Sequence, residues 1–440
     1  MLTIIHHGAR HTVTGSCHEL KIGKSSLLID CGLEQGNNAQ NPQIDFPIKS
    51  VEAVILTHAH IDHVGRLPWL LAAGFVGKVY CTPATAALLP LLLRDSLRIY
   101  LGLAEAQIRH ILNRLDKQIM TLSYGQWLRI RLPREQSYCY VRFSPAGHIL
   151  GSAITEIKLA DENIVAFSGD IGPSNTPLLP DPVPPKRADF LVLESTYGDK
   201  IHEDVEGRAT RLEAIIQHSL QDGGAIIIPA FSIGRTQELL FDIENLIHQH
   251  AVSDRLPILL DSPMAVEVTH AYRRFRKLWS KEAKHRYEQH RHPLAFEQCI
   301  TIDGYREHKR VVNRLAASGE PAIVIAASGM CQGGRVMDYL AQLLPDPRTD
   351  VIFAGYQAED TLGCQLQEGE SQVYIDGHRI EVKAQIHHMS GYSAHADQAD
   401  LLRFVERIEQ GPGEIRLVHG EENAQSELAG KLKALGYHVS

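Results

Sequence analysis

Three histidines and one aspartate within six residues constrain this chain more than any other feature. His58, His60, Asp62 and His63 directly follow the apolar segment 54–56, and an apolar, helix-like run comes after them. This order predicts a strand, a short loop and a helix, with the polar side chains held in the loop. A solvated histidine-rich surface segment is the alternative, but the apolar residues on both sides argue against it.

Imidazole and carboxylate groups are zinc ligands, and this loop offers more of them than one tetrahedral ion takes from so short a segment. We therefore expect two metal ions side by side, with His58 and His60 on one ion and Asp62 and His63 on the other. Two adjacent ions suit hydrolysis, because together they can activate water and hold the attacked group.

Single polar residues also stand at the ends of other apolar runs. They are Asp30, His148, Asp170 and His419. Each one alone is typical of a cap or a surface residue, but four of them beside the histidine cluster indicate the rest of a metal site. A carboxylate such as Asp170 can bridge two cations, and we expect Asp30 to hold a ligand imidazole in the tautomer that binds metal.

Two sets of motifs resemble those of a known family. The first set matches the four ordered motifs of the metallo-β-lactamase fold: Asp30, His58-x-His60-x-Asp62-His63, His148 and Asp170. The second set is similar to three further motifs of the β-CASP subgroup: Glu194, His395 and His419. This resemblance covers essentially the whole chain. It implies an α/β fold, with a metallo-β-lactamase αββα sandwich and an inserted β-CASP α/β/α domain, and the subgroup contains nucleases.

The resemblance also implies a role for each motif residue. Two zinc ions would be held by His58, His60 and His148 on one side and by Asp62, His63 and His419 on the other, with Asp170 bridging them. The catalytic residues would be Asp62, Glu194 and His395. In this set His395 serves as the general acid, and Glu194 orients it or shares its proton.

The resemblance implies a zinc-dependent ribonuclease that hydrolyses single-stranded RNA through a two-metal-activated hydroxide and leaves 5′-phosphate and 3′-hydroxyl ends. RNA is expected over DNA because RNA-directed members carry a histidine at the position of His419. Endonucleolytic cleavage is the first expectation, and a 5′-exoribonuclease is the alternative. A small-molecule ester or thioester hydrolase of the same fold needs no second domain, and a catalytically silent scaffold would have lost metal ligands.

The pattern of apolar residues changes near residue 203, after which expected apolar strands alternate with expected helices. Continuous apolar strands of this kind predict a parallel α/β sheet. We expect a first part of the metallo-β-lactamase domain at 1–203, the inserted β-CASP domain at 204–370 and the second part of the first domain at 371–440. Strands near 373 and at 381–386 are expected to return to the first domain.

Three strand-to-helix turns in the insert carry small residues and arginines. Such turns attract anions, because helix N-termini offer free N–H groups and glycine lets a phosphate approach the backbone. Tight turns need Gly and Ser for their own geometry, which is the alternative. The residues expected to bind RNA phosphates are Ser232, Arg235, Thr236, Ser262, Ser328, Gly329, Gly333 and Arg335.

The chain has 440 residues and a net charge of −8, which is unusual for a protein that binds phosphates. A basic, aromatic stretch at 272–291 is either a helix that faces nucleic acid or a solvated amphipathic helix. We expect no membrane span and no signal peptide, and the seven scattered cysteines indicate reduced thiols and a cytoplasmic protein. A homodimer is an open alternative to a monomer.

Overall fold

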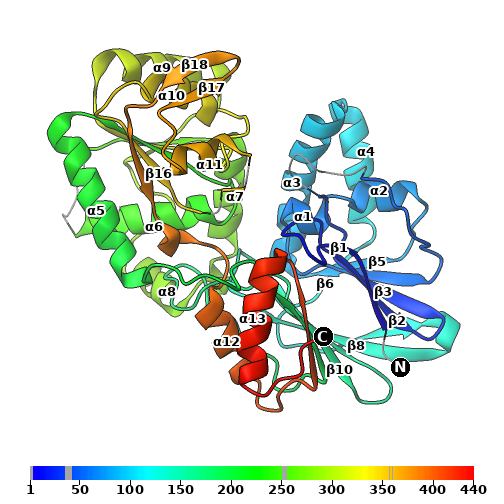
Figure 1. Cartoon of the computed structure of the whole chain (residues 1–440). Coiled ribbons are helices and arrows are strands. Elements are labelled where there is room, and N and C mark those ends of the chain that lie inside the picture. Colours follow the sequence, from blue (N-terminus) through cyan, green and yellow to red (C-terminus); the bar gives the residue numbers. More distant parts are fainter. Residues whose placement is uncertain (1–2, 35–41, 250–254, 356, 359) are drawn as a thin grey trace. The chain divides into compact units, whose positions relative to one another are not determined.

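The computed structural model describes residues 3–34, 42–249, 255–355, 357–358 and 360–440. The chain forms two compact units (Figure 1). The first unit comprises Met1–Ser174, Leu179–Ile201 and His395–Ser440. The second, which we call the insert unit, comprises Asn175–Leu178 and His202–Ala394.

Two six-stranded sheets form the first unit. One has the order β1-β2-β3-β4-β5-β6, with bounds Thr3–Gly8, Cys17–Ile22, Ser25–Ile29, Val51–Ile55, Lys78–Cys81 and Ile119–Thr121. The other has the order β20-β11-β10-β9-β8-β7, with bounds Glu414–Val418, Phe190–Glu194, Ile164–Phe167, Ala153–Lys158, Ser137–Pro145 and Leu128–Leu132. Both sheets mix parallel and antiparallel pairs.

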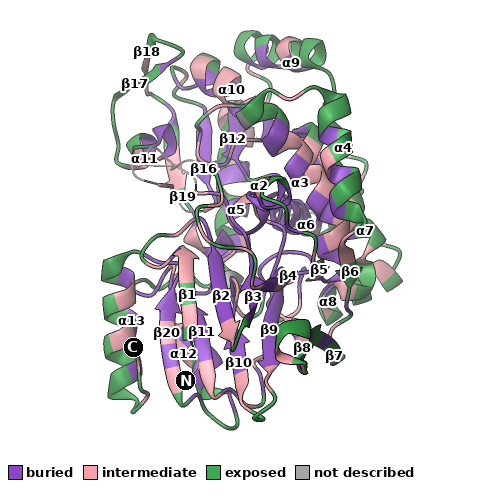
Figure 2. Cartoon of the chain, turned by 90° about the vertical axis from the view of Figure 1, so that its right-hand side faces the viewer, coloured by how far each residue is buried: buried purple, intermediate pink, exposed green. Residues whose placement is uncertain are grey.

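Alternate residues of the central strands belong to different apolar clusters, as the period of two in a strand requires. In β3, Leu27 and Ile29 pack between the two sheets, whereas Leu28 packs on the outer face with helical residues. In β11, Val192 lies between the sheets and Leu191 packs outward. These central strands are therefore buried on both faces, which Figure 2 shows in purple.

Helices cover both outer faces of the sandwich. Those on the first sheet are α1 Ile61–Val64, α2 Leu67–Ala72, α3 Pro83–Leu101 and α4 Glu105–Asp116. Those on the second sheet are α12 Gln398–Glu406 and α13 Glu422–Ala434. The resulting layer order is helix, sheet, sheet, helix, and it confirms the predicted αββα sandwich.

The insert unit is built on a six-stranded parallel sheet of order β14-β13-β15-β12-β16-β19. The strand bounds in that order are Cys299–Thr301, Ile258–Asp261, Ala322–Ala326, Ala225–Pro229, Asp350–Phe353 and Gln385–His388. The helices are α5 Val205–Asp222, α6 Arg235–His248, α7 Pro263–Arg274, α8 Lys281–Glu288, α9 Tyr305–Ser318, α10 Val336–Leu343 and α11 Leu362–Gln367. This sheet confirms the predicted parallel insert.

The end of the insert differs from the prediction of residue 370. A hairpin of β17 (Gln372–Ile375) and β18 (His378–Glu381) packs into the apolar core of the insert unit, and β19 is an edge strand of its sheet. The expectation that these strands return to the first unit is therefore wrong, and the insert unit extends to Ala394.

The basic stretch 272–291 is not one helix. It comprises the end of α7, a short 3-10 turn at Arg276–Leu278 and α8. The Ser280 side chain caps α8 by accepting a hydrogen bond from the Ala283 N–H at 3.0 Å.

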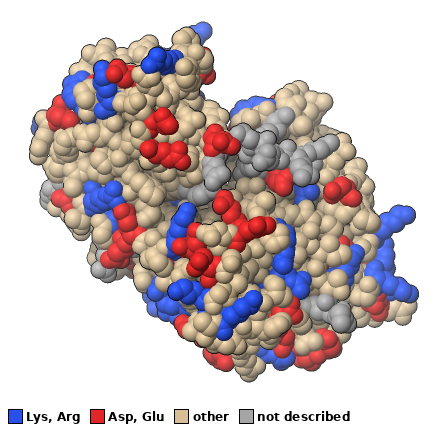
Figure 3. All heavy atoms as spheres, in the orientation of Figure 1, with Lys and Arg blue, Asp and Glu red and all other residues tan. Residues whose placement is uncertain are grey.

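None of the seven cysteines forms a disulfide, and five of them are buried. In the described part of the chain, no helix combines the length and the apolar character that a membrane crossing requires. On the face that Figure 3 shows, lysines and arginines are interspersed with aspartates and glutamates, so neither sign of charge covers it.

Candidate metal centre

The ends of several strands of the first unit meet at one place. Strands β3 and β4 run parallel in one sheet, and β10, β11 and β20 run parallel in the other, so the loops after them leave from the same edges. The turn between β8 and β9 reaches this edge as well, because β9 begins beside the end of β10. These loops, together with α1 directly after the β4 loop, carry every candidate ligand that the sequence indicated.

One group of four donor atoms comes from three histidines and an aspartate. The Nδ1 atom of His60 lies 3.1 Å from His58 Nε2 and 3.0 Å from His148 Nε2. The Oδ2 atom of Asp170 lies 3.5 Å from the Nε2 atoms of both His58 and His148. His58 and His148 are buried, and His60 is half-buried.

A second group uses the other carboxylate oxygen of Asp170. His63 Nε2 lies 3.2 Å from His419 Nε2 and 3.2 Å from Asp170 Oδ1. Asp62 Oδ2 lies 3.3 Å from His419 Nε2 and 3.8 Å from His63 Nε2. The two groups therefore meet at Asp170, which offers one oxygen atom to each.

The donor atoms fit a pair of tetrahedral zinc ions. Zinc–nitrogen bonds of about 2.0–2.1 Å place the ligand atoms of a tetrahedral site about 3.3 Å apart, which agrees with the spacing in both groups. Asp170 Oδ1 is buried and accepts no hydrogen bond from the described part of the chain. A buried carboxylate oxygen without a donor is costly unless a cation or another partner satisfies it.

Burial and neighbouring charges set the ionisation of these groups. Burial lowers the pKa of His58 well below its usual value and that of His60 to about 4, so both imidazoles are neutral and have a lone pair to give. Burial would raise the pKa of Asp170, but His419, His63 and His58 hold it well below the usual range. Burial would lower the pKa of His63, whereas Asp170, Asp30 and Asp62 raise it well above its usual value.

Asp30 supports the second group from behind. Its Oδ2 atom lies 2.8 Å from His63 Nδ1 and accepts a hydrogen bond from Thr57 Oγ1 at 2.8 Å. Its Oδ1 atom accepts from the Thr57 N–H, also at 2.8 Å. Thr57 Oγ1 lies 3.1 Å from His58 Nδ1, so one carboxylate orients His63 directly and His58 through a threonine.

Glu194 and His395 form a pair next to Asp170. The Nδ1 atom of His395 lies 3.2 Å from both carboxylate oxygens of Glu194, and its Nε2 atom lies 3.9 Å from Asp170 Oδ2. Glu194 is buried and also accepts hydrogen bonds from the Ile171 N–H at 2.6 Å and from Thr196 Oγ1 at 2.6 Å. Burial would lower the pKa of His395, but Glu194 and, to a lesser extent, Asp170 raise it.

Two threonines were missed by the sequence reasoning. Thr57 couples Asp30 to His58, as described above. Thr196 Oγ1 lies 2.6 Å from Glu194 Oε2 and 3.2 Å from His419 Nδ1, so it touches both the pair and the second donor group. The only signal in the sequence is that each threonine lies within two residues of a candidate site residue in a strand-end loop.

The structure places the three expected phosphate-binding turns after β12, β13 and β15, which are neighbours in the insert sheet. Ser232 Oγ lies 3.0 Å from Ser262 Oγ, and the Gln357 side chain donates to the Gly329 carbonyl oxygen at 2.9 Å. Ser328 Oγ accepts from the Gln332 N–H at 3.1 Å.

Several of these side chains already have partners inside the protein. Thr236 Oγ1 donates to the Phe231 carbonyl oxygen at 2.8 Å. The guanidinium of Arg335 binds Asp261 Oδ1 at 2.6 Å and the carbonyl oxygens of Ile302 and Asp303 at 2.7 Å each. Arg235 is buried at the start of α6, and Gly333 has a φ of 137°.

Three family models match successive parts of the chain. Residues 12–125 match the metallo-beta-lactamase superfamily, residues 236–366 match the Beta-Casp domain, and residues 379–440 match the Zn-dependent metallo-hydrolase RNA specificity domain. A ribonuclease of Thermus thermophilus, TTHA0252, is 36% identical over 100% of this chain and 98% of its own length. The chain belongs to the β-CASP family of metallo-β-lactamase-fold proteins.

Other relatives of this β-CASP protein carry different names. An RNase J-like protein of Methanocaldococcus jannaschii is 32% identical over 96% of this chain and 93% of its own length. The transcription termination factor FttA of the same organism is 31% identical over 97% of this chain and 68% of its own length. A solved structure of a protein of unknown function from Enterococcus faecalis has a TM-score of 0.54 at 13% identity and covers 95% of this chain and 94% of its own; it supports the fold alone.

Proposed function

We propose that this chain is a zinc-dependent ribonuclease that cuts phosphodiester bonds within single-stranded RNA. The observation that carries the proposal is the meeting of two four-atom donor groups at Asp170, with the His395–Glu194 pair beside it. The match of residues 379–440 to an RNA specificity domain and the likeness to a relative named as a ribonuclease support RNA as the substrate.

In this proposal one zinc ion would be held by His58, His60 and His148, and the other by Asp62, His63 and His419. Asp170 would offer one oxygen atom to each donor group. When bound there, zinc supplies Lewis-acid stabilisation of the phosphoryl oxygens and makes water a better nucleophile at neutral pH. The neutral state of His58 and His60 leaves their lone pairs free for this task.

His395 is the proposed general acid. Burial would lower the pKa of His395, but Glu194 raises it, and with Glu194 at Nδ1 the Nε2 atom is the one that can give a proton away. A water oxygen adds to phosphorus and gives up one proton to the solvent, the bond between phosphorus and the 3′ oxygen breaks, and His395 protonates that leaving oxygen. The products are a 5′-phosphate end and a 3′-hydroxyl end.

The phosphate contacts proposed for the insert unit are the backbone N–H groups and small side chains of its three turns. The buried Ser232–Ser262 pair and the Gly329 turn support this role, because they are neighbours at one edge of the sheet. Arg335 contributes to this edge of the sheet by holding Asp261 in place, since its guanidinium is bonded to Asp261 and to the Ile302 carbonyl oxygen.

The test is cleavage of a 5′-end-labelled single-stranded RNA, beside DNA of the same sequence, by zinc-loaded protein. His395→Ala should keep both zinc ions and lose about 10²- to 10⁴-fold in the single-turnover rate. His110→Ala, which changes an exposed histidine on α4, is the matched control and should cut at the wild-type rate.

Internal fragments with 5′-phosphate ends from wild type alone would support the proposal. Release of mononucleotides from the labelled end would replace endonuclease by 5′-exonuclease. Wild-type turnover by well-folded His395→Ala protein would remove this residue from the acid role, and intact polymers after incubation with fully metallated wild type would refute the ribonuclease proposal.

A further inference from the structure

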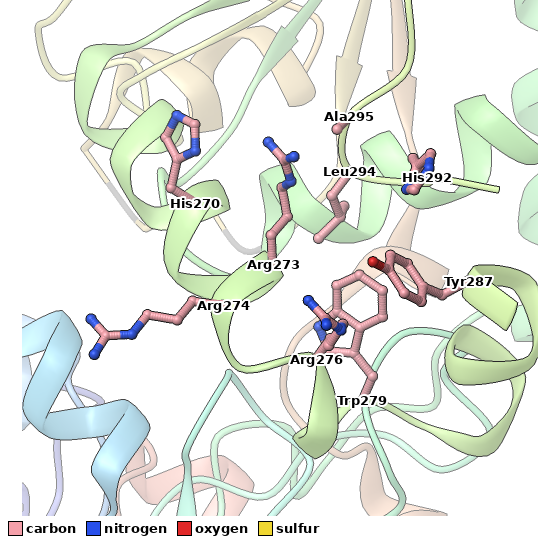
Figure 4. Close-up of a pocket in the computed structure, with 9 residues that line it drawn as sticks. All are labelled: His270, Arg273, Arg274, Arg276, Trp279, Tyr287, His292, Leu294 and Ala295. Carbon is pink, nitrogen blue, oxygen red and sulfur yellow. The ribbon is translucent and has the colours of Figure 1, made fainter. Parts of the chain in front are cut away.

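The insert unit contains a basic cavity that takes no part in the metal centre. It has a volume of about 490 Å³ and is lined by α7, α8 and the segments beside them, with Arg273, Arg274, Arg276, Trp279, Tyr287 and His292 among its residues (Figure 4). None of the described residues that line it carries a carboxylate. Pockets of about 300–1,000 Å³ are the usual size for small organic ligands.

The surrounding segment has a strong excess of positive charge. Residues 272–291 contain eight lysines and arginines against two glutamates, in a chain whose net charge is −8. Two carboxylates close to this segment are already used, because Glu244 binds Arg291 at 2.6 Å and Glu282 pairs with Arg286.

Two guanidinium groups of the lining have no acidic partner among the described residues. Within the described ranges, no carboxylate lies within ion-pair distance of Arg273 or Arg276, and both side chains are exposed. Two exposed guanidinium groups three residues apart can bind one phosphate through paired hydrogen bonds, which is the geometry that arginine suits best.

Aromatic rings form another side of the cavity. The guanidinium carbon of Arg276 lies 4.9 Å from the ring centre of Tyr287, and the rings of His292 and Trp279 meet Tyr287 edge to face at 5.4 and 6.4 Å. The Trp279 indole is buried and donates to the Tyr272 carbonyl oxygen at 3.0 Å, so it is a fixed wall. Tyr287 is half-buried and His292 is exposed, which leaves ring surface for a stacked base.

We propose that this cavity holds one nucleotide of an RNA strand, with its phosphate on Arg273 and Arg276 and its base against Tyr287 and His292. The inference rests on the proposed ribonuclease function and deepens it, because the bound nucleotide is not the one that is cut. A nucleoside phosphate matches both halves of the lining, since it combines a dianionic or monoanionic phosphate with a flat ring.

The first measurement is the fluorescence anisotropy of a labelled oligouridylate with the full zinc-loaded chain, over a series of salt concentrations. The variant R273Q/R276Q should bind about 10-fold more weakly than wild type. It should also lower the slope of log Kd against log salt by about 0.7 for each phosphate contact that is lost. R273Q alone tests the same point without disturbing the Arg276–Tyr287 contact.

The matched control is K281Q/K284Q, which removes the same charge from exposed positions of α8 outside the cavity lining. Wild-type binding by this control supports the cavity. An equal loss in both double variants means that the charge acts diffusely and overturns the inference, as does unchanged binding by R273Q/R276Q.

A second arm titrates uridine monophosphate and follows the tryptophan fluorescence in the W69F/W127F background, where Trp279 is the remaining tryptophan. Loss of this signal in R273Q supports the cavity with a free nucleotide as its occupant, whereas loss of RNA binding alone supports an RNA strand. In cleavage assays R273Q/R276Q should raise KM and leave kcat unchanged. Failure of wild type to cut RNA would refute the proposed function. The loss of RNA binding in R273Q/R276Q would still test the cavity proposal independently of cleavage.

Discussion

Asp30→Asn tests whether a single buried carboxylate sets the tautomer of a metal ligand. Asp30 accepts hydrogen bonds from the Thr57 N–H and hydroxyl at 2.8 Å each and faces His63 Nδ1 at 2.8 Å. The amide oxygen of asparagine can keep the Thr57 N–H, but its NH₂ group then faces His63 Nδ1. Two donors cannot share that contact, so the imidazole has to move its proton to Nε2, the atom in the second donor group.

The expected effect is a loss of zinc affinity at the second donor group. Outer partners of this kind are worth about 10- to 100-fold in metal affinity, or about 1.4–2.7 kcal/mol. The loss of zinc affinity should be smaller at the first donor group, because His58 contacts Asp30 only through Thr57 Oγ1. The substitution is isosteric, so the loss of stability should stay within the about 1.5–3 kcal/mol of a charge-assisted hydrogen bond.

Competition with a chromophoric zinc chelator measures the two affinities separately. Wild type should release its two ions over a narrow range of chelator concentration. Asp30→Asn should release one of them at about a 10- to 100-fold lower chelator concentration. Asp376→Asn changes an exposed aspartate in the turn between β17 and β18 and controls for the chemistry of the substitution. Wild-type release of both ions by folded Asp30→Asn protein would refute the tautomer argument.

Two other substitutions test separate parts of the structure. Asp170→Ala removes one donor from each group, so the zinc content should fall at both sites together with turnover; retention of two ions per chain would contradict the bridging role. Glu19 is buried and bonded to His7, Lys21 and Ser26, and although burial would raise its pKa, these bonds lower it to about 2. Because the pKa of Glu19 is lowered on folding, its ionised form stabilises the fold at pH values above the unfolded pKa of about 4.5. This contribution is up to about 3 kcal/mol and is lost as the pH falls towards 2. Chemical unfolding of Glu19→Gln and wild type should show a difference at pH 7 that shrinks below pH 4.5, and a difference independent of pH would exclude this origin.

The positions of the candidate ligands could be read from the sequence because they depend on local patterns. Each ligand follows a short apolar run, and a strand buried on both faces needs such a run. His148, Asp170 and His419 therefore stand where strands end, and strand ends on one edge come together whatever the details of the loops. A bridging position of Asp170 is already expected from the sequence, and the structure adds the distances from its two oxygen atoms to the donor groups.

The end of the insert could not be read in the same way. β19 has the sequence Gln385–His388, with the burial pattern of an exposed edge strand. Its polar residues do not distinguish one sheet from another, because the partner strand β16 is more than 30 residues away in sequence and nothing local encodes that pairing. Non-local pairing decided the boundary.

Charge in the sequence does not say which partners an arginine has inside the protein, as Arg335 shows. Arg335 follows a glycine-rich turn, which favoured a phosphate contact. In the structure its guanidinium donates to the buried Asp261, which also contacts His308 at 2.7 Å and accepts from the Tyr339 hydroxyl at 2.6 Å. A buried carboxylate needs hydrogen-bond donors or a positive charge nearby, so it can bind an arginine that would otherwise extend into solvent.

The register of two neighbouring strands joins the His395–Glu194 pair to the two donor groups. Glu194 at the end of β11 pairs with Val418 at the end of β20, so His419 leaves the sheet one residue beyond Glu194. Thr196 Oγ1 spans the remaining gap between Glu194 and His419. Because the side-chain period of a strand is two, a shift of β20 by one residue would turn its core residues outward and move His419 away from both Thr196 and His63. The geometry of the last motif therefore depends on the apolar packing of Leu417 and Val418 on opposite faces of the sheet as much as on the ligands themselves.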